Sequence, residues 1–195
     1  MKADGTICQV ARNSPSCLAA FSADTVPALL VYGAVVRLVG PAGTRDVPLS
    51  ELYQDDGMRW LKLLPGEILT EVRLPPPPPG LEARYDKLRV RQSIDYPLVG
   101  VAIGLVRDAE GSVEQARVIL NAVSSMPESV PQASLLLGQP LTDEGIEAVA
   151  QAAYTQVKPL TTHGVQPIYR KKMVKLTVRK ALQGLMMKGL PGQAV

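Results

Sequence analysis

The alternation of hydrophobic and polar residues is clearest in the second half of the chain, beyond a proline run at residues 75–79. Residues 85–91 alternate between apolar and basic side chains, which predicts a strand with one solvated face. Residues 97–106 are almost wholly apolar and predict a buried strand. Residues 113–123 predict a third strand, after a turn at residues 109–111. Three successive strands of this kind predict an antiparallel meander.

The rest of this half has the periodicity of helices. A short helix over residues 131–137 and a longer one over 143–157 are expected, and Thr142 is the predicted N-cap of the second. The last helix is expected over residues 168–188, with these apolar side chains at helical spacing on one face: Val174, Val178, Ala181, Leu182 and Leu185. This face should pack on the sheet. Strands followed by helices predict an α+β fold.

The first half is predicted to form a smaller unit of short elements. Ser22 or Asp24 is a candidate N-cap for a helix that contains Pro27 and ends at Gly33. The other expected elements are strands over residues 34–39, 44–48 and 68–74, and a short helix over 51–54 capped by Ser50.

The proline run between the two halves predicts a boundary. Five consecutive prolines cannot join a sheet ladder and favour an extended, stiff form. One interpretation is a ligand for a proline-recognition domain; the other, which we favour, is an interdomain spacer. We therefore expect one domain over residues 1–74 and another over 81–195, joined by a linker at 75–80.

Composition and charge narrow the class of protein. A chain of 195 residues suits one domain or two small ones. Its net charge of +3 is weak evidence for a nucleic-acid partner, and the basic side chains of the last helix suit a solvated face or a subunit contact. No apolar run is long enough to span a bilayer, and the first residues lack the apolar core of a secretory signal. We expect a cytoplasmic protein with neither a nucleic-acid nor a membrane partner.

Few residues stand out as candidates for chemistry. His163, the one histidine, supports neither a catalytic triad nor a zinc site. Cys8 and Cys17 lie in a loop-like segment, where cysteines are ordinary small residues or, with two further thiolates, cluster ligands. A polar corner at residues 92–96, between a half-solvated and a buried strand, could present its side chains to a flat ligand.

Three segments resemble a known family, the flavin subunits of the molybdenum hydroxylases. They are KLRVRQSIDYPLVGVA (residues 87–102), PGEILTEVRLP (65–75) and GTICQVARNSPSCLAAFSADTVPALLVYGA (5–34). The resemblance covers residues 5–185. It implies the C-terminal part of a PCMH-type FAD-binding domain, followed by a three-stranded antiparallel sheet packed with helices, like the C-terminal domain of the carbon monoxide dehydrogenase flavoprotein.

The resemblance also implies which residues meet the flavin. Asp24 of a Ser-x-Asp-x-x-Pro element would approach the FAD ribose, whose hydroxyls a carboxylate can accept, although from the residues alone it is a helix cap. Periodicity alone places Ile68 and Leu69 in the core, whereas the family places them against the flavin. The implied FAD contacts are Ser22, Asp24, Ile68, Leu69, Ser93, Asp95 and Tyr96.

The third segment is most similar to the 4-hydroxybenzoyl-CoA reductase branch. There, Cys8 and Cys17 match the last two of four ligands of a [4Fe-4S] cluster, and the first two would lie before Met1. The Gly-rich loop that holds the FAD pyrophosphate in this family would also precede the chain. We therefore expect an N-terminally truncated flavin subunit.

The resemblance implies an electron-transfer function and particular partners. The FAD subunit relays electrons in a complex with a molybdopterin-binding large subunit and a [2Fe-2S] small subunit, and we expect this oxidoreductase subunit to be inactive as an isolated chain. The missing N-terminal half of the flavin subunit would be a further partner. The alternative is a non-catalytic docking module that binds no FAD by itself.

Overall fold

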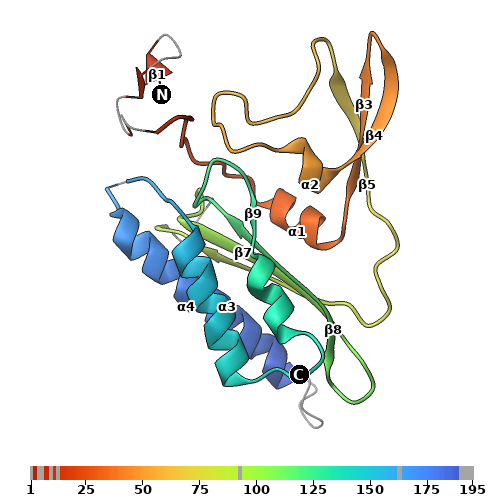
Figure 1. Cartoon of the computed structure of the whole chain (residues 1–195), viewed down its shortest axis with the longest axis vertical. Coiled ribbons are helices and arrows are strands. Elements are labelled where there is room, and N and C mark those ends of the chain that lie inside the picture. The colour runs from red at the N-terminus through yellow and green to blue at the C-terminus, as the bar shows by residue number, and fades with distance from the viewer. Residues whose placement is uncertain are drawn as a thin grey trace.

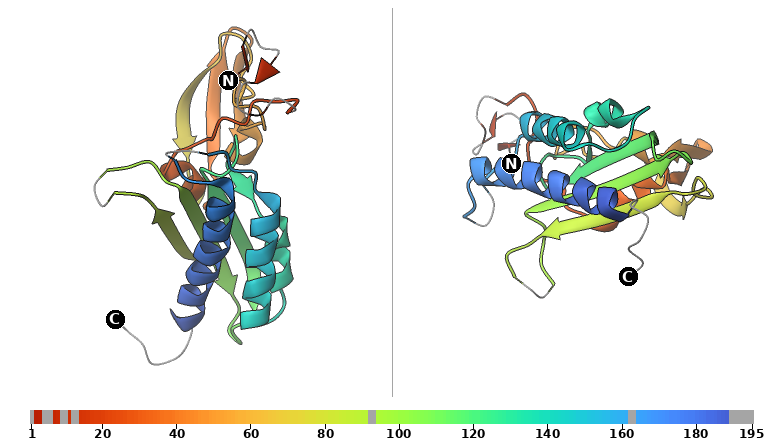
Figure 2. Two further views of the ribbon diagram at one scale, coloured as in Figure 1. Left: turned by 90° about the vertical axis from the view of Figure 1, so that its left-hand side faces the viewer. Right: turned by 90° about the horizontal axis from the view of Figure 1, so that it is seen from below.

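The computed structural model describes residues 2–3, 7–8, 11, 14–91, 94–161 and 164–188, those up to 8 and Lys188 by their backbone alone. Figure 1 shows a small sheet with two short helices above a larger sheet covered by longer helices. The side view in Figure 2 shows that the longer helices lie on one face of the larger sheet. The predicted α+β class is confirmed.

The larger sheet is the predicted meander with one strand more. Its order is β6-β7-β8-β9, and every neighbouring pair is antiparallel. The extra strand β9 has only two residues, too few for a periodic signal in the sequence. The bounds are β6 Glu82–Leu88, β7 Val99–Arg107, β8 Val113–Asn121 and β9 Glu128–Ser129.

Three helices cover one face of this sheet, namely the 3-10 helix η1 (Pro131–Leu136) and the α-helices α3 (Asp143–Gln156) and α4 (Pro167–Lys188). Thr142 caps α3 as predicted, because its hydroxyl accepts a hydrogen bond from the backbone N–H of Gly145 at 3.1 Å. The whole predicted apolar face of α4 is buried, and it shares one core with the buried side chains of β7 and β8.

The smaller unit is a three-stranded antiparallel sheet with the order β4-β3-β5. Val36 and Leu38 of its central strand face α2 and form a compact core with Leu49 and Leu52. The elements are α1 Thr25–Val31, β3 Val35–Gly40, β4 Gly43–Pro48, α2 Leu49–Leu52 and β5 Ile68–Arg73, and a separate pair is formed by β1 Lys2–Ala3 and β2 Ile7–Cys8.

Helix α1 joins the two units because it packs on the face of the larger sheet that α3 and α4 leave open. Val31 contacts Ala102 of β7 and Ile119 of β8 in a small shared cluster. The approach is close: a Cβ at Gly104 would lie 2.5 Å from Cγ1 of Val31. Nη1 of Arg117 adds a 2.9 Å hydrogen bond to the carbonyl oxygen of Val31. A glycine in β7 therefore determines how near the smaller unit can come.

Two expected elements end or begin elsewhere. Strand β6 ends at Leu88, and Val90, which the alternation groups with it, is exposed. The short helix α2 begins two residues earlier than expected, after Pro48 rather than Ser50, because the extended Pro48 already turns the chain out of β4. Among the described helices, none combines the length and the apolar character that a membrane span needs.

Candidate functional site

Asp24 lies at the start of α1 but makes no capping hydrogen bond to the described helix. Its carboxylate instead accepts hydrogen bonds from two side chains of β6, the hydroxyl of Tyr85 at 3.2 Å and Nζ of Lys87 at 2.6 Å. The side chain of Asp24 remains 48% exposed. The prediction that Asp24 caps the helix is therefore wrong for the side chain. Tyr85 and Lys87 were not predicted as site residues, although their spacing of two puts both on one face of β6.

Asn121, at the end of β8, fastens the segment before α1 to the larger sheet. Its Nδ2 donates to the carbonyl oxygen of Ala23 at 3.2 Å, and its Oδ1 accepts from the backbone N–H of Ala122 at 2.8 Å. Ala122 has a φ of 66°, a left-handed conformation that is uncommon for a residue with a side chain. A Cβ at Gly100 would lie 2.9 Å from the Tyr85 hydroxyl and 3.1 Å from Cβ of Asn121. The group around Asp24 therefore depends on a glycine at this position.

The electrostatics of this group keep Tyr85 neutral. Burial of the phenol, followed by the negative charge of Asp24, raises the pKa of Tyr85 to about 12. The neutral hydroxyl is a donor, so it can hold one carboxylate oxygen of Asp24 while Lys87 holds the other. Asp24 is thus a half-exposed carboxylate that two side chains of β6 hold in place.

The hydroxyl oxygen of Ser22 is buried and has no hydrogen-bond partner among the described residues. Buried polar atoms are nearly always paired, so an orphaned hydroxyl two residues from Asp24 indicates a group that the described residues do not supply. A ligand hydroxyl or amide at this position would satisfy it. The predicted site residues Ser22 and Asp24 thus lie in an environment that suits a polar ligand.

Asp95 makes several hydrogen bonds to its neighbours in the corner after β6. Its two carboxylate oxygens accept from the guanidinium of Arg91, at 3.0 Å from Nη2 and 3.3 Å from Nε, and from the backbone N–H groups of Arg91 and Tyr96. The bonded Arg91 side chain is the main cause that lowers the pKa of Asp95 well below its usual range. With Asp95 bound inward, Tyr96 is 69% exposed. Ser93 lies outside the described residues.

The side chains of Ile68 and Leu69 are not in the core. They lie on β5, at the edge of the small sheet, where they are 67% and 40% exposed. The interpretation from periodicity, which places both in the core, is therefore wrong, because the strand has a neighbour on one side alone. Val72 and Leu74 continue the same exposed apolar edge. Ile68 and Leu69 thus belong to a different sheet from the Asp24 group.

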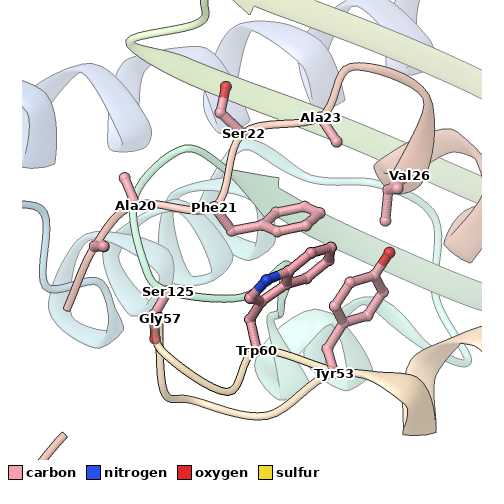
Figure 3. Close-up of a pocket in the computed structure, with 10 residues that line it drawn as sticks. Ala20, Phe21, Ser22, Ala23, Val26, Tyr53, Gly57, Trp60 and Ser125 are labelled. Carbon is pink, nitrogen blue, oxygen red and sulfur yellow. The ribbon is translucent and has the colours of Figure 1, made fainter. Parts of the chain in front are cut away.

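A cavity of about 400 Å³ opens beside the segment that leads into α1 (Figure 3). Three aromatic rings line it, with centroids 5.0 Å apart for Phe21 and Tyr53 and 6.2 Å apart for Tyr53 and Trp60. Figure 3 shows the Ser22 hydroxyl turned away from these rings. The cavity can take an apolar or aromatic group, but it does not explain the unpaired hydroxyl. No spacing in the sequence marks this cluster, because its rings come from separate loops.

Cys17 is a free thiol and 2% exposed. Its backbone is fixed by hydrogen bonds from its N–H to Asp56 and from Gly57 to its carbonyl oxygen. The described residues contain no group of three or more His, Cys, Asp and Glu side chains that could hold a metal ion. The side chain of Cys8 and all of His163 lie outside the described residues. The predicted role of Cys8 and Cys17 as two ligands of an iron–sulfur cluster therefore stays a prediction.

The arrangement can be compared with known families. A helix-covered antiparallel sheet follows a smaller three-stranded sheet, and a polar group lies where the two join. The family described as the CO dehydrogenase flavoprotein C-terminal domain matches residues 83–185. The family described as the FAD binding domain in molybdopterin dehydrogenase matches residues 5–77. The chain therefore belongs to the FAD-binding subunit family of the molybdopterin dehydrogenases.

Individual relatives agree with this assignment. The carbon monoxide dehydrogenase medium chain of Afipia carboxidovorans is 31% identical over 81% of this chain and 54% of its own length. The aldehyde oxidoreductase FAD-binding subunit of Escherichia coli is 30% identical over 87% of this chain and 50% of its own length. The solved carbon monoxide dehydrogenase from Hydrogenophaga pseudoflava superposes with a TM-score of 0.75 at 27% identity, over 82% of this chain and 55% of that one. The chain spans about half the length of the curated relatives that it matches.

Proposed function

We propose that the chain forms part of the FAD-binding electron-transfer subunit of a molybdenum-dependent hydroxylase or reductase complex. Family membership supports the cofactor, and the names of the relatives support an oxidoreductase. When bound, FAD would accept and pass on electrons, while the residues of the chain bind and orient it. The large molybdopterin-binding subunit and the small [2Fe-2S] subunit are the proposed partners, in the cytoplasm.

The buried hydroxyl of Ser22, unpaired among the described residues and two residues before the half-exposed carboxylate of Asp24, is the observation that carries this proposal. A ribose or ribityl chain presents several hydroxyls within a few ångströms, which suits one orphaned hydroxyl and one carboxylate. The carboxylate is fixed in advance by Tyr85 and Lys87, so little conformational entropy is lost when it accepts a ligand hydroxyl. Asp24 and Ser22 would therefore hold the sugar part of FAD.

Exposed apolar and aromatic side chains supply the other proposed contacts. Ile68 and Leu69 would lie against the flavin, whose ring system is flat and largely apolar. Tyr96, with Ser93 and Asp95, would meet the isoalloxazine from the corner after β6. Asp95 would act through the conformation of this corner, because its carboxylate is already taken by Arg91 and two backbone N–H groups.

A further polypeptide segment would complete the site. Strand β5 is an edge strand with exposed apolar side chains, and an edge of this kind is a template for pairing with another strand. The proposed occupant is the part of a flavin subunit that the matched relatives contain and this chain does not. It would also supply the backbone N–H groups that neutralise the FAD pyrophosphate.

Flavin content of the native complex tests the proposal. The chain, tagged and purified anaerobically from its own cells, should bring down one FAD per chain, measured from the visible absorption spectrum. Asp24→Asn should reduce the FAD content, because an amide accepts ribose hydroxyls less strongly than a carboxylate. The control Asp143→Asn, in the first turn of α3, should leave the FAD content unchanged. A colourless complex from the wild-type chain would contradict FAD binding.

A docking module that binds no FAD is the second candidate. The exposed edge of β5 favours it, since this surface fits a protein partner whether or not a flavin is present. The two candidates differ in the same experiment. A stable complex that lacks flavin, and that Ile68→Asp disrupts, would support the docking module.

Within this class we propose the 4-hydroxybenzoyl-CoA reductase branch, with Cys8 and Cys17 as two of four ligands of a [4Fe-4S] cluster. The sequence around both cysteines supports this assignment. The described residues supply one thiol, so the other ligands would come from elsewhere. Iron and acid-labile sulfide in the anaerobically purified complex should exceed the content of the [2Fe-2S] subunit. Cys17→Ser should remove the excess, and the control Ser16→Ala should keep it.

A further inference from the structure

Arg170, in the first turn of α4, is 1% exposed. Burying a guanidinium is costly, because it loses the hydration of a full charge, and such groups are retained only where hydrogen bonds compensate for that loss. The same desolvation lowers the pKa of Arg170 below its ordinary value. A hydrophobic side chain would fill the space at lower cost. The hydrogen bonds of the guanidinium should therefore explain why a cation is buried at this position.

The guanidinium of Arg170 donates to backbone carbonyl oxygens of three separate segments. Nε and Nη2 donate to Leu98 at 3.2 and 3.0 Å, and Nη1 donates to Leu160 at 2.7 Å. Nη2 also donates to Ala122. Five donors in one rigid plane are available in arginine alone, so no other side chain can make these bonds together.

Two of these segments carry the proposed flavin contacts. Leu98 follows Tyr96 by two residues, and its N–H closes the corner with a 2.8 Å hydrogen bond to the carbonyl oxygen of Leu88. Ala122 follows Asn121, whose amide holds Ala23 next to Asp24. One side chain thus fixes the end of the corner that presents Tyr96 and the turn that positions Asp24.

The turn at Ala122 needs support of this kind. Its left-handed backbone conformation is unfavourable for a residue with a side chain and persists where the surroundings hold it in place. The carbonyl oxygen of Ala122 accepts from Arg170, while its N–H donates to Asn121 and Phe21. Both sides of the strained peptide are therefore bonded.

We propose that Arg170 is a positioning residue for the flavin site: it sets the relative placement of the Tyr96 corner and the Asp24 segment from behind the sheet. This inference rests on the proposed function. Arg170 does not touch the cofactor; it acts through Leu98 and Ala122.

The test combines hydrogen exchange with flavin spectroscopy on the native complex. Arg170→Lys keeps the charge but replaces the planar fork by a single ammonium group, and Arg170→Met removes all donors. Val178→Ala, a buried substitution on the same helix, is the matched control for a loss of packing. The expected result for Arg170→Lys is at least tenfold faster amide exchange in Leu98, Val99 and residues 121–123 than in the rest of the sheet. Val178→Ala should show no such selectivity.

The flavin readout separates positioning from stability. Arg170→Lys should weaken FAD binding at least fivefold and change the visible spectrum of the bound flavin, whereas Val178→Ala should keep both near wild type. If the Arg170→Met variant does not fold, the FAD affinity and the flavin spectrum of the Arg170→Lys complex decide the test. An Arg170→Lys complex with wild-type FAD affinity and spectrum overturns the inference and leaves the proposed function intact. A wild-type complex without FAD overturns the proposed function, and the positioning role is lost with it.

Discussion

Strands β7 and β5 are both rich in apolar residues, yet β7 is buried and β5 is largely exposed. Eight of the nine residues of β7 are buried, whereas five of the six residues of β5 are exposed. Strand β7 has strands on both sides, helices on one face and α1 on the other. Among the described residues, strand β5 has one neighbouring strand, and most of its side chains are exposed. The larger unit is therefore complete as it stands, and the smaller unit has an edge that is suited to a partner.

The larger unit therefore supplies most of the stability of the fold, and the smaller unit has the edge that is suited to assembly. Hydrophobic burial is the main favourable contribution to folding, and most of the buried side chains belong to the single core under α3 and α4. The exposed residues of β5 contribute little to the chain alone. Substitutions in the two units should therefore differ in size and in kind.

The largest expected effect is that of Leu182→Ala in α4. Leu182 is fully buried in the large core, so its truncation removes apolar contacts and leaves a cavity. The free energy of unfolding should fall by about 3 kcal/mol, which urea denaturation would measure. Leu176→Ala on the exposed side of the same helix is the control and should cost under about 0.5 kcal/mol. Equal losses from the two variants would place the core elsewhere.

Gly104→Ala should have the next largest effect, because it acts on the contact between the two units. The new methyl group would overlap Cγ1 of Val31, a buried side chain that has little room to move. We expect a loss of about 1–3 kcal/mol in unfolding free energy, together with faster amide exchange in α1.

The matched control for Gly104→Ala is Gly184→Ala in α4. There the new methyl group meets the end of the Arg84 side chain, a long side chain that can shift if its ion pair with Asp86 rearranges, and alanine favours the helix. The loss of stability should therefore be smaller than that of Gly104→Ala. If both glycine variants behave alike, close packing of α1 on β7 does not join the units.

The sequence predicts the elements of the larger, complete unit far better than those of the smaller unit, whose edge at β5 is open. Alternation and helical spacing gave the three long strands and α3 and α4, and the buried face of α4 contains every residue expected on it. These signals are strong because the elements are long and each has a fully covered face. The two-residue strand β9 carries too few positions for any periodicity.

The candidate site was predicted in part. Ser22 and Asp24 were predicted through a family motif, but their partners Tyr85 and Lys87 lie some 60 positions further along, and no local pattern connects them. The prediction for Ile68 is wrong in another way. An apolar strand residue is expected in a core, but Ile68 lies exposed at an edge. Both errors arise because burial and pairing depend on which strands meet, and local periodicity does not specify this.

A smaller effect is expected at the far end of the open unit, where Glu67 holds the loop before β5. Its carboxylate accepts from the Arg45 guanidinium at 2.7 and 2.8 Å and from the backbone N–H of Leu64. The Arg45 side chain, followed by the Leu64 N–H, lowers the pKa of Glu67 from 4.5 to about 2.

A carboxyl group with a lowered folded-state pKa stabilises the fold above its unfolded pKa, and the contribution disappears as the pH falls through the folded value. Wild type should therefore be more stable than Glu67→Gln at pH 7, and the difference should shrink between about pH 5 and pH 2. Urea denaturation at a series of pH values measures the two curves. A difference that is constant with pH would show that the charge of Glu67 contributes nothing.

The smallest effect on stability, and the largest on assembly, is expected from Ile68→Ser. This side chain is 67% exposed, so the chain alone should lose under about 0.5 kcal/mol. In the native complex, the same change places a hydroxyl where the proposed partner segment or flavin needs an apolar contact. Recovery of the complex by affinity purification should therefore fall, although the unfolding curve of the chain does not move. The control is Leu137→Ser, which is also exposed but lies after η1 on the complete unit. If Leu137→Ser reduced recovery as much as Ile68→Ser, the edge of β5 would have no special role in assembly.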